Sequence, residues 1–299
     1  MTFKILFYLI PFLPIFNLIG QVNKSNLYTL EYSWSNDQKI TFNHPQLITN
    51  FNSEGYNNHP FFLESEVLIF SSQNPNQIQP DLVIANLTLK TLEKLTQTTT
   101  GEYSSSLRNP SQKNLLSAIR MEFVESDTLV RLWELPIDGS SDGKPLFPEI
   151  LYSGYHLWLN SSEVVLFEVG NPNQLVLRSL TDTSKKIYLT EKPGRCFKKN
   201  KNGEVIFLNQ EKEILKFSPT TNQTTTLGSF PGNGQDFEIL ENDMVLASSD
   251  KKLFISNLNK IPLDWKEAMD LSVLGGTQIT RIATNYKNKI ALVVENITP

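Results

Sequence analysis

The sequence is poor in the residues that carry redox, metal and base chemistry: it has one cysteine and three histidines among 299 residues. A single cysteine cannot form an intramolecular disulfide, so packing alone must stabilise the fold. The segment around Cys196, GRCFKKN, supplies cations but no base that would activate a thiol. We therefore interpret Cys196 as a small apolar residue within a strand.

An excess of positive charge is also missing. The chain has 27 Lys and Arg against 31 Asp and Glu, a net charge of −4, and no basic run. Nucleic-acid binding requires clustered cations that neutralise phosphates, so we expect no nucleic-acid partner. The sequence has no H-E-x-x-H motif and no P-loop. The pattern GSSDG around Ser141 is followed by KPLFPEIL, whose prolines exclude the helix of a serine-hydrolase elbow, so we predict no catalytic residues.

The longest apolar run lies at the N-terminus. Residues 1–20, MTFKILFYLIPFLPIFNLIG, contain one cation and two prolines. This run is too short and too interrupted for a comfortable membrane span of about 20 residues, and it resembles a secretory signal cut after Gly20. We predict a signal peptide over residues 1–20, a mature domain over 21–299 without a membrane span, and a periplasmic or secreted protein. An uncleaved N-terminal anchor is the alternative.

The rest of the chain consists of repeated units of short alternating strands. One unit begins with EGYNNHPFF and continues with EVLIFSS, DLVIANL and TLEKLT. Successive units start at Tyr56, Tyr103, Tyr155, Arg195, Asp236 and Arg281, at spacings of 47, 52, 40, 41 and 45 residues. Periods of about 40–50 residues with several short strands each are typical of β-propeller blades, which bury their faces by packing on one another.

The last unit has no outer strands of its own. The N-terminal text NLYTLEYSW reads as the second strand of a blade and QKITF as its third, so we expect the two chain ends to share one blade and close the ring. The predicted fold is all-β, a six-bladed β-propeller closed by N-terminal strands that complete the last blade. The segment DWKEAMDLS, residues 264–272, is expected to form a loop or a single turn.

Three stretches carry a family resemblance: EYSSSLRNP with IRMEF and TLVRLWELPIDG, then YHLWL with VVLFEVGNPNQLVL, and finally ITRIATNYKNKIALVVE. They resemble the units of TolB-like six-bladed propellers, the WD-like repeat proteins that many bacteria export. The resemblance covers the chain after the signal, without the additional N-terminal domain that TolB carries. It implies a stand-alone exported propeller that acts as a binding platform.

The innermost strand of each propeller blade lines a central channel, and we expect the loops that lead into these strands to surround a ligand site at the channel mouth. Side chains at the unit starts are then the candidates for binding: Tyr56, His59, Tyr103, Arg108, Tyr155, His156, Trp158, Arg195, Asp236, Glu238 and Arg281. The alternative is structural, because aromatic side chains also pack between blades and arginines also bond to carbonyls. We favour this alternative for Trp158, Arg195 and Arg281.

Metal and acid–base chemistry have weaker support. His59 and His156 each lie an odd number of residues after a unit-start tyrosine, so a regular strand would place them on the face opposite that tyrosine. They belong to non-adjacent blades, and zinc needs about four ligands, so we predict no metal site. Asp236 and Glu238 would share one face of a strand about 6–7 Å apart, a spacing that paired catalytic carboxylates also use.

These observations predict a monomeric, non-enzymatic binding or scaffolding module whose channel mouth holds a protein partner or a small ligand, with no cofactor. The competing interpretation is a hydrolase or lactonase that uses the channel carboxylates with calcium, although the sequence contains no D-x-D-x-D-G loop.

Overall fold

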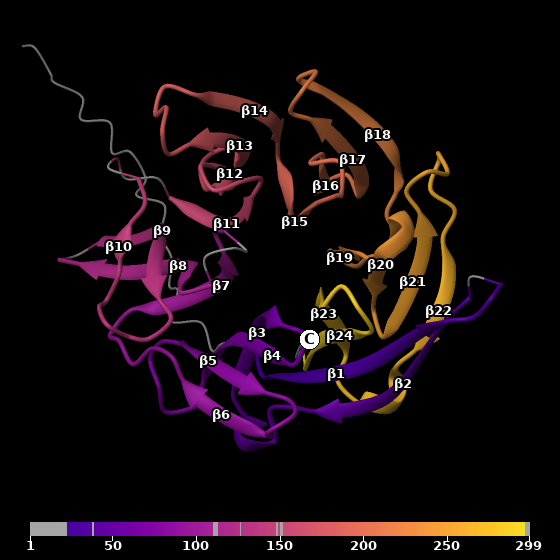
Figure 1. Ribbon diagram of the computed structural model, residues 1–299, viewed down its shortest axis with the longest axis horizontal. Coiled ribbons are helices and arrows are strands. Elements are labelled where there is room, and N and C mark those ends of the chain that lie inside the picture. Colours follow the sequence, from indigo (N-terminus) through magenta and orange to yellow (C-terminus); the bar gives the residue numbers. More distant parts are fainter. Residues whose placement is uncertain are drawn as a thin grey trace, which may run out of the picture.

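The computed structural model describes residues 23–296 apart from 38, 110–112, 126, 148, 150 and 151. The predicted signal peptide, residues 1–20, lies outside the described residues. The described strands form six four-stranded sheets arranged as blades around a central axis (Figure 1). The prediction of an all-β six-bladed propeller is confirmed.

Blades 1 to 3 follow one another along the chain. Blade 1 contains, from the axis outward, β3 (Tyr56–Glu64), β4 (Val67–Gln73), β5 (Asp81–Asn86) and β6 (Thr91–Lys94). Blade 2 contains β7 (Gly101–Leu107), β8 (Leu115–Val124), β9 (Asp127–Pro136) and the two-residue β10 (Lys144–Pro145). Blade 3 contains β11 (Ser153–Trp158), β12 (Glu163–Glu168), β13 (Gln174–Ser179) and β14 (Lys186–Glu191).

Blades 4 to 6 complete the ring. Blade 4 contains β15 (Pro193–Lys199), β16 (Val205–Asn209), β17 (Glu213–Ser218) and β18 (Gln223–Ser229). Blade 5 contains β19 (Asp236–Ile239), β20 (Met244–Ser249), β21 (Lys252–Asn257) and β22 (Lys266–Asp270). Blade 6 contains β23 (Gln278–Thr284), β24 (Lys289–Glu295), β1 (Ser25–Trp34) and β2 (Ile40–Leu47). Short 3-10 helices cover Asn50–Asn52, Glu241–Asp243 and Ser272–Leu274.

The two ends of the chain meet in blade 6, as predicted. β1 pairs with β24 in antiparallel register from Ser25 opposite Glu295 to Glu31 opposite Lys289. The predicted order was wrong by one place: β1 is the third strand of the blade and β2 the fourth, because the C-terminal unit supplies both inner strands. Pairing the chain ends within one sheet leaves no open blade edge at the junction.

The segment DWKEAMDLS was also predicted wrongly. Residues 266–270 of this segment form β22, the outermost strand of blade 5, and pair with β21. The helix preference of its Lys, Glu, Ala and Met residues is outweighed, because β21 offers an unpaired row of backbone donors and acceptors at this position.

The core lies between the blades rather than at one centre. In the described part of the chain, six clusters of buried apolar side chains each join two neighbouring blades. The second strands are sandwiched on both faces, which explains their nearly continuous apolar sequence: all five residues of β16, VIFLN, are buried. All four residues of the outermost β6, TLEK, are exposed. Burial therefore falls from the inner strands toward the rim.

Candidate functional site

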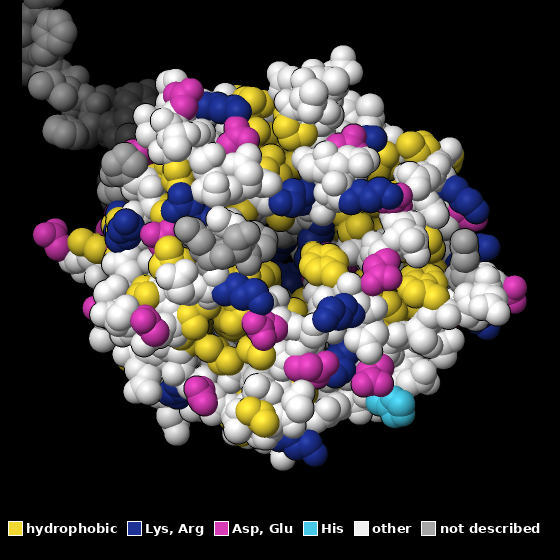
Figure 2. All heavy atoms as spheres, in the orientation of Figure 1, with side chains coloured by type: hydrophobic (Ala, Val, Ile, Leu, Met, Phe, Trp, Pro, Cys, Tyr) yellow, Lys and Arg dark blue, Asp and Glu magenta, His cyan; other side chains and the backbone are white. Residues whose placement is uncertain are grey.

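A cavity of about 1010 Å³ lies on the propeller axis. Its wall comes from the innermost strands of all six blades, and each lining stretch begins inside a strand and continues past that strand's C-terminal end. The cavity therefore opens toward the turns that follow the innermost strands, at the end of the channel opposite to the loops that we expected to surround it. Figure 2 shows a hollow near the centre of one face, with Lys and Arg side chains around it.

Interruptions in strand register aim side chains into this channel. Five of the six innermost strands, β3, β7, β11, β15 and β23, shift register close to the unit-start position. Such bulges break the alternation of a strand and redirect one side chain. His59 and Ser104 sit inside two of these irregularities with φ of 55° and 51°. His59 consequently lies on the same side as Tyr56, with ring centroids 6.4 Å apart, so the predicted opposite face was wrong for this histidine.

Aromatic rings from three blades meet at the inner end of the cavity. The imidazole of His59 lies 6.0 Å from the ring of Tyr103 and 6.0 Å from that of Tyr155, centroid to centroid. The Nδ1 atom of His59 is 2.9 Å from the Ser104 hydroxyl, which holds the imidazole in place. His59 and Tyr155 line the cavity, and Tyr56 and Tyr103 stand behind them.

Two guanidinium groups lie beside these rings. Arg281 on β23 donates from Nη2 to the Tyr155 hydroxyl at 3.1 Å and from Nη1 to the Thr280 carbonyl at 2.9 Å. Its Cζ atom lies 5.6 Å from the centroid of the Tyr155 ring. Arg195 on β15 lines the cavity and forms no hydrogen bond or ion pair with any described residue. Burial, followed by the charges of Arg281 and Arg195, holds the pKa of His59 well below its usual value, so this imidazole is neutral.

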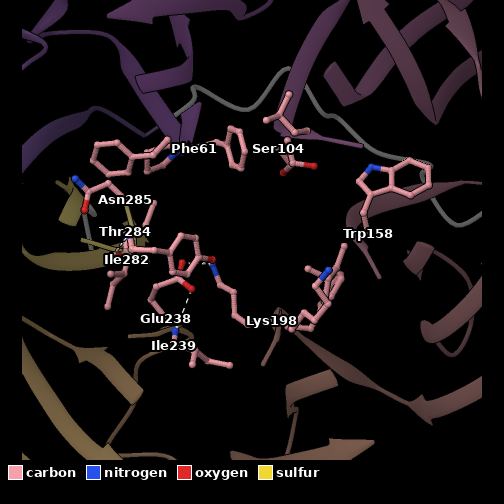
Figure 3. Close-up of a pocket in the computed structure, with 18 of the residues that line it drawn as sticks. Phe61, Ser104, Trp158, Lys198, Glu238, Ile239, Ile282, Thr284 and Asn285 are labelled. Carbon is pink, nitrogen blue, oxygen red and sulfur yellow. Dashed lines mark hydrogen bonds and ion pairs between the residues drawn. The ribbon is translucent and has the colours of Figure 1, made fainter. Parts of the chain in front are cut away.

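The two carboxylates that the sequence pointed to are both engaged. Asp236 is buried, and its Oδ2 accepts a hydrogen bond from the backbone N–H of Ile282 on the neighbouring blade at 2.7 Å. Glu238 is also buried; its Oε2 lies 2.7 Å from the Lys198 ammonium and its Oε1 accepts from the N–H of Ile239 at 3.0 Å (Figure 3). Burial raises the pKa of Glu238, although Lys198 opposes this shift.

His156 is part of the wall between blades 2 and 3 rather than a free ligand. Its Nε2 atom lies 2.9 Å from the Ser106 hydroxyl and 2.7 Å from the Ser117 hydroxyl. The same Ser117 hydroxyl accepts a hydrogen bond from Nε1 of Trp158 at 2.7 Å, and Trp158 is buried in the core cluster of this interface. Burial lowers the pKa of His156 to about 3, so this imidazole is neutral near pH 7.

Charged pairs occupy the outer part of the cavity wall. Arg108 donates from Nη1 to Glu134 at 2.8 Å and from Nε to the Ser161 carbonyl at 2.8 Å, which ties blade 2 to blade 3. Lys201 pairs with Asp243 at 2.8 Å across the turns of blades 4 and 5. These pairs neutralise part of the charge at the rim.

The structure brings most of the predicted site residues to one cavity. Those that line it are His59, Arg108, Tyr155, His156, Trp158, Arg195, Asp236, Glu238 and Arg281. The two others, Tyr56 and Tyr103, do not line the cavity, and their rings lie behind His59. Trp158 and Arg108 make blade-to-blade contacts, as the structural alternative expected for Trp158, whereas Arg195 makes no such pairing with any residue that the structure describes.

Sequence reasoning missed several cavity residues, among them Lys198, Ser104 and Tyr286. A spacing signal exists for two of them, since Lys198 pairs with Glu238 at a separation of 40 residues and Ser104 contacts His59 at a separation of 45. One repeat along the chain is one blade around the ring, so equivalent positions of adjacent units meet. Tyr286 lies in the β23–β24 turn, and the charge of the Glu238 carboxylate raises the pKa of its hydroxyl.

The two potential nucleophiles considered from sequence are in non-catalytic settings. Cys196 is buried; its Sγ donates to the carbonyl of Phe237 at 3.2 Å, and burial raises the pKa of the thiol well above its usual value. Ser141 lies in the exposed connection between β9 and β10, and the element that follows it is strand β10 instead of the helix that a nucleophile elbow requires. The described residues contain no group of three or more His, Cys, Asp or Glu side chains placed to hold a metal ion.

Comparison with known proteins places this geometry in a fold class. No family model and no curated protein matches the chain. Its fold is similar to that of a putative TolB from Agrobacterium tumefaciens, with a TM-score of 0.63, 11% identity, and coverage of 92% of this chain and 99% of that one. A chain of a nidogen/laminin complex gives a TM-score of 0.63 at 10% identity over 90% of this chain and 98% of that one. A putative gluconolactonase gives 0.55 at 11% identity over 81% and 89%.

These likenesses establish the six-bladed propeller fold, with TolB propellers among its structural neighbours, as the sequence resemblance predicted. The neighbours differ in what their names describe, so the fold by itself assigns no activity. Within the described residues, none of the helices has the length and hydropathy required to cross a bilayer.

Proposed function

We propose that this protein is a non-enzymatic binding or scaffolding module whose ligand enters the axial cavity. The observation that carries the proposal is the set of contacts that the cavity side chains make: the carboxylates of Asp236 and Glu238 are bonded to blade backbone or to Lys198, whereas the Arg195 guanidinium bonds to no described residue. Carboxylates with these partners stabilise the contacts between neighbouring blades. A solvated guanidinium inside a concave site is available to bind a ligand.

The size and shape of the cavity support a protein segment or a small molecule as the ligand. A volume of about 1010 Å³ is at the upper end of small-molecule sites, which are typically about 300–1,000 Å³. Aromatic rings at the inner end and charged pairs at the rim provide apolar contact and orientation. Six blades contribute to one site, so a ligand there would contact residues far apart in the sequence.

The proposal includes export and a monomeric state. The apolar segment of residues 1–20, with its single cation, supports a secretory signal, and a periplasmic or secreted propeller would meet its ligand outside the cytoplasm. N-terminal sequencing of the protein purified from its native host tests this part. A mature N-terminus at residue 21 is the expected result, and retention of Met1 would contradict it.

The experiment for the binding role is capture from the exported fraction with matched variants. Lys199 ends the innermost strand β15 at the cavity wall, and Lys199→Trp places a bulky ring there. Lys266→Trp makes the same change on β22, the outermost strand of blade 5. We expect the Lys266 variant to capture the same partner or ligand as the natural protein and the Lys199 variant to lose it. Equal capture by both variants would overturn the cavity as the binding site.

The competing function is a hydrolase or lactonase that uses the channel carboxylates with calcium. The fold likeness to a putative gluconolactonase is the observation that favours it. Calcium coordinates about 6–8 oxygen ligands, so both carboxylates would have to leave their present partners. Titration with calcium followed by thermal unfolding separates the two: a rise in Tm that Asp236→Asn abolishes would support the enzyme, and no rise is expected for the binding module.

A further inference from the structure

The inner end of the cavity contains hydrogen-bond donors that the described residues do not use. Arg281 uses one N–H of Nη1 and one of Nη2, and no described residue accepts from its remaining guanidinium N–H groups. Arg195 uses none. These two side chains come from blades 4 and 6 and line the same cavity as His59 on blade 1, and both charges act on its imidazole. The unused donors therefore reach the cavity from two different blades.

The orientation of one guanidinium is fixed before any ligand arrives. Arg281 is held by the Tyr155 hydroxyl at 3.1 Å and stacked near the Tyr155 ring at 5.6 Å. Burial alone lowers the pKa of Arg281, but Tyr155 and Asp236 more than compensate, so the group stays charged. A planar, pre-oriented guanidinium recognises an anion with two parallel hydrogen bonds at a reduced entropic cost.

The described charged side chains that line this end of the cavity are unequal in number. Arg195 and Arg281 line it together with Asp236, the one carboxylate among these lining residues without a cationic partner, because Lys198 and Glu238 neutralise each other at 2.7 Å. Asp236 is held by the backbone of Ile282 at 2.7 Å. Two positive charges against one negative leave an excess of one positive charge, which a ligand with one negative charge would neutralise. A carboxylate carries one negative charge near pH 7, whereas a phosphate monoester carries about 1.5 to 2.

We propose that the axial cavity binds a ligand through a carboxylate held between Arg195 and Arg281, with the rings of His59 and Tyr155 beside it. This inference rests on the proposed binding function and specifies the chemistry of the ligand's buried end. The carboxylate belongs either to a small organic acid or to the C-terminus of a peptide, and the two sources share the same recognition.

Isothermal titration tests the proposal with defined probes. Benzoate and D-glucuronate represent small acids, a short peptide with a free C-terminus represents a chain end, and benzamide and the amidated peptide are their uncharged counterparts. We expect at least one carboxylate probe to bind. Its uncharged counterpart should bind with an affinity that is lower by about tenfold or by a larger factor. Binding by the acids alone assigns a small molecule, and binding by the peptide alone assigns a chain end.

Arginine variants connect that affinity to the site. Arg195→Gln and Arg281→Gln are each expected to weaken the bound probe by about tenfold to a hundredfold, the range for a hydrogen bond to a charged group. Arg131→Gln, which removes a cation from the outer strand β9 where it pairs with Glu122 at 2.8 Å, is the control and should leave the affinity unchanged. Arg195 is accessible to solvent, so its variant should remain folded even if the Arg281 variant does not.

Three results would overturn the carboxylate proposal: no carboxylate probe binds at millimolar concentration, inorganic phosphate binds more tightly than every carboxylate, or Arg195→Gln leaves the affinity unchanged. Failure here is distinguishable from failure of the binding function. If Lys199→Trp still abolishes capture while no carboxylate binds, the cavity remains the binding site and only the chemistry of the ligand is wrong.

Discussion

Lys198 on β15 and Glu238 on β19 form an ion pair of 2.7 Å that links blades 4 and 5 inside the axial cavity. Glu238 is buried, and burial raises the pKa of its carboxyl even with Lys198 beside it. Replacing only one residue of such a pair lowers the stability of the fold, because the remaining charge is left without a partner in a poorly solvated site.

Removing one partner should therefore lower the free energy of unfolding more than removing both. We expect Lys198→Met to lower the free energy of unfolding by about 3–5 kcal/mol, and Lys198→Met combined with Glu238→Leu to recover much of that loss. Denaturant unfolding measures both. Lys252→Met, which breaks an exposed pair with Glu267 on the outer strands of blade 5, is the control and should change stability little. A double variant less stable than the single variant would contradict this description of the pair.

His156 should make stability depend on pH below neutrality. Its pKa is about 3 in the folded protein against an ordinary value of 6.5, so the unfolded chain binds a proton that the folded protein does not. The stabilising contribution is fully present above pH 6.5 and is lost as the pH falls toward 3. Replacing His156 with Gln should reduce the slope of the free energy of unfolding against pH by about 1.4 kcal/mol per pH unit between these two values.

The measurement is the free energy of unfolding as a function of pH for the natural protein and His156→Gln. His44→Gln, on the exposed part of β2, controls for the introduction of a glutamine. An unchanged slope in the His156 variant would mean that this imidazole already binds a proton in the folded protein.

The junction of the two chain ends should carry substantial stability. Leu30 on β1 is 1% exposed and packs in the cluster that joins blades 5 and 6, whereas Leu92 on β6 is 43% exposed. We expect Leu30→Ala to cost about 2–5 kcal/mol, as is typical of buried leucines, and Leu92→Ala to cost far less. Similar losses for the two variants in denaturant unfolding would contradict closure of the ring by β1.

Cys196 should be protected as long as the protein is folded. The thiol is buried against Phe237, and burial raises its pKa, so little thiolate forms near pH 7. A thiol reagent such as 5,5′-dithiobis(2-nitrobenzoate) should react slowly in buffer and rapidly in denaturant. Fast reaction with the folded protein would contradict the packing described for β15 and β19.

Most of the fold could be predicted because its signal is periodic. The spacing of Tyr56, Tyr103, Tyr155, Arg195, Asp236 and Arg281 reports the blade repeat, and all six lie on innermost strands. Residues 264–272 show the limit of the approach: the outer strand β22 carries helix-favouring residues, and the need of β21 for a pairing partner decides its structure. An edge strand packs on one side only, so its own sequence constrains it weakly.

The candidate site was harder to predict for two physical reasons. Register shifts in the innermost strands redirect His59 and Ser104, and alternation along a regular strand cannot anticipate them. The state of each charge depends on contacts between blades, such as Lys198 with Glu238, which local sequence does not show. Contacts one repeat apart are the signal that sequence reasoning can use for such pairs.

Hydrogen exchange of the protein in complex with its captured partner or with a bound carboxylate tests the axial cavity most directly. We predict that binding slows exchange of backbone amides at the C-terminal ends of β15 and β23 and in the turns after them, because these segments line the cavity. The outer strands β6 and β18 should exchange as they do in the free protein. Protection confined to those outer strands, with the cavity segments unchanged, would contradict the account.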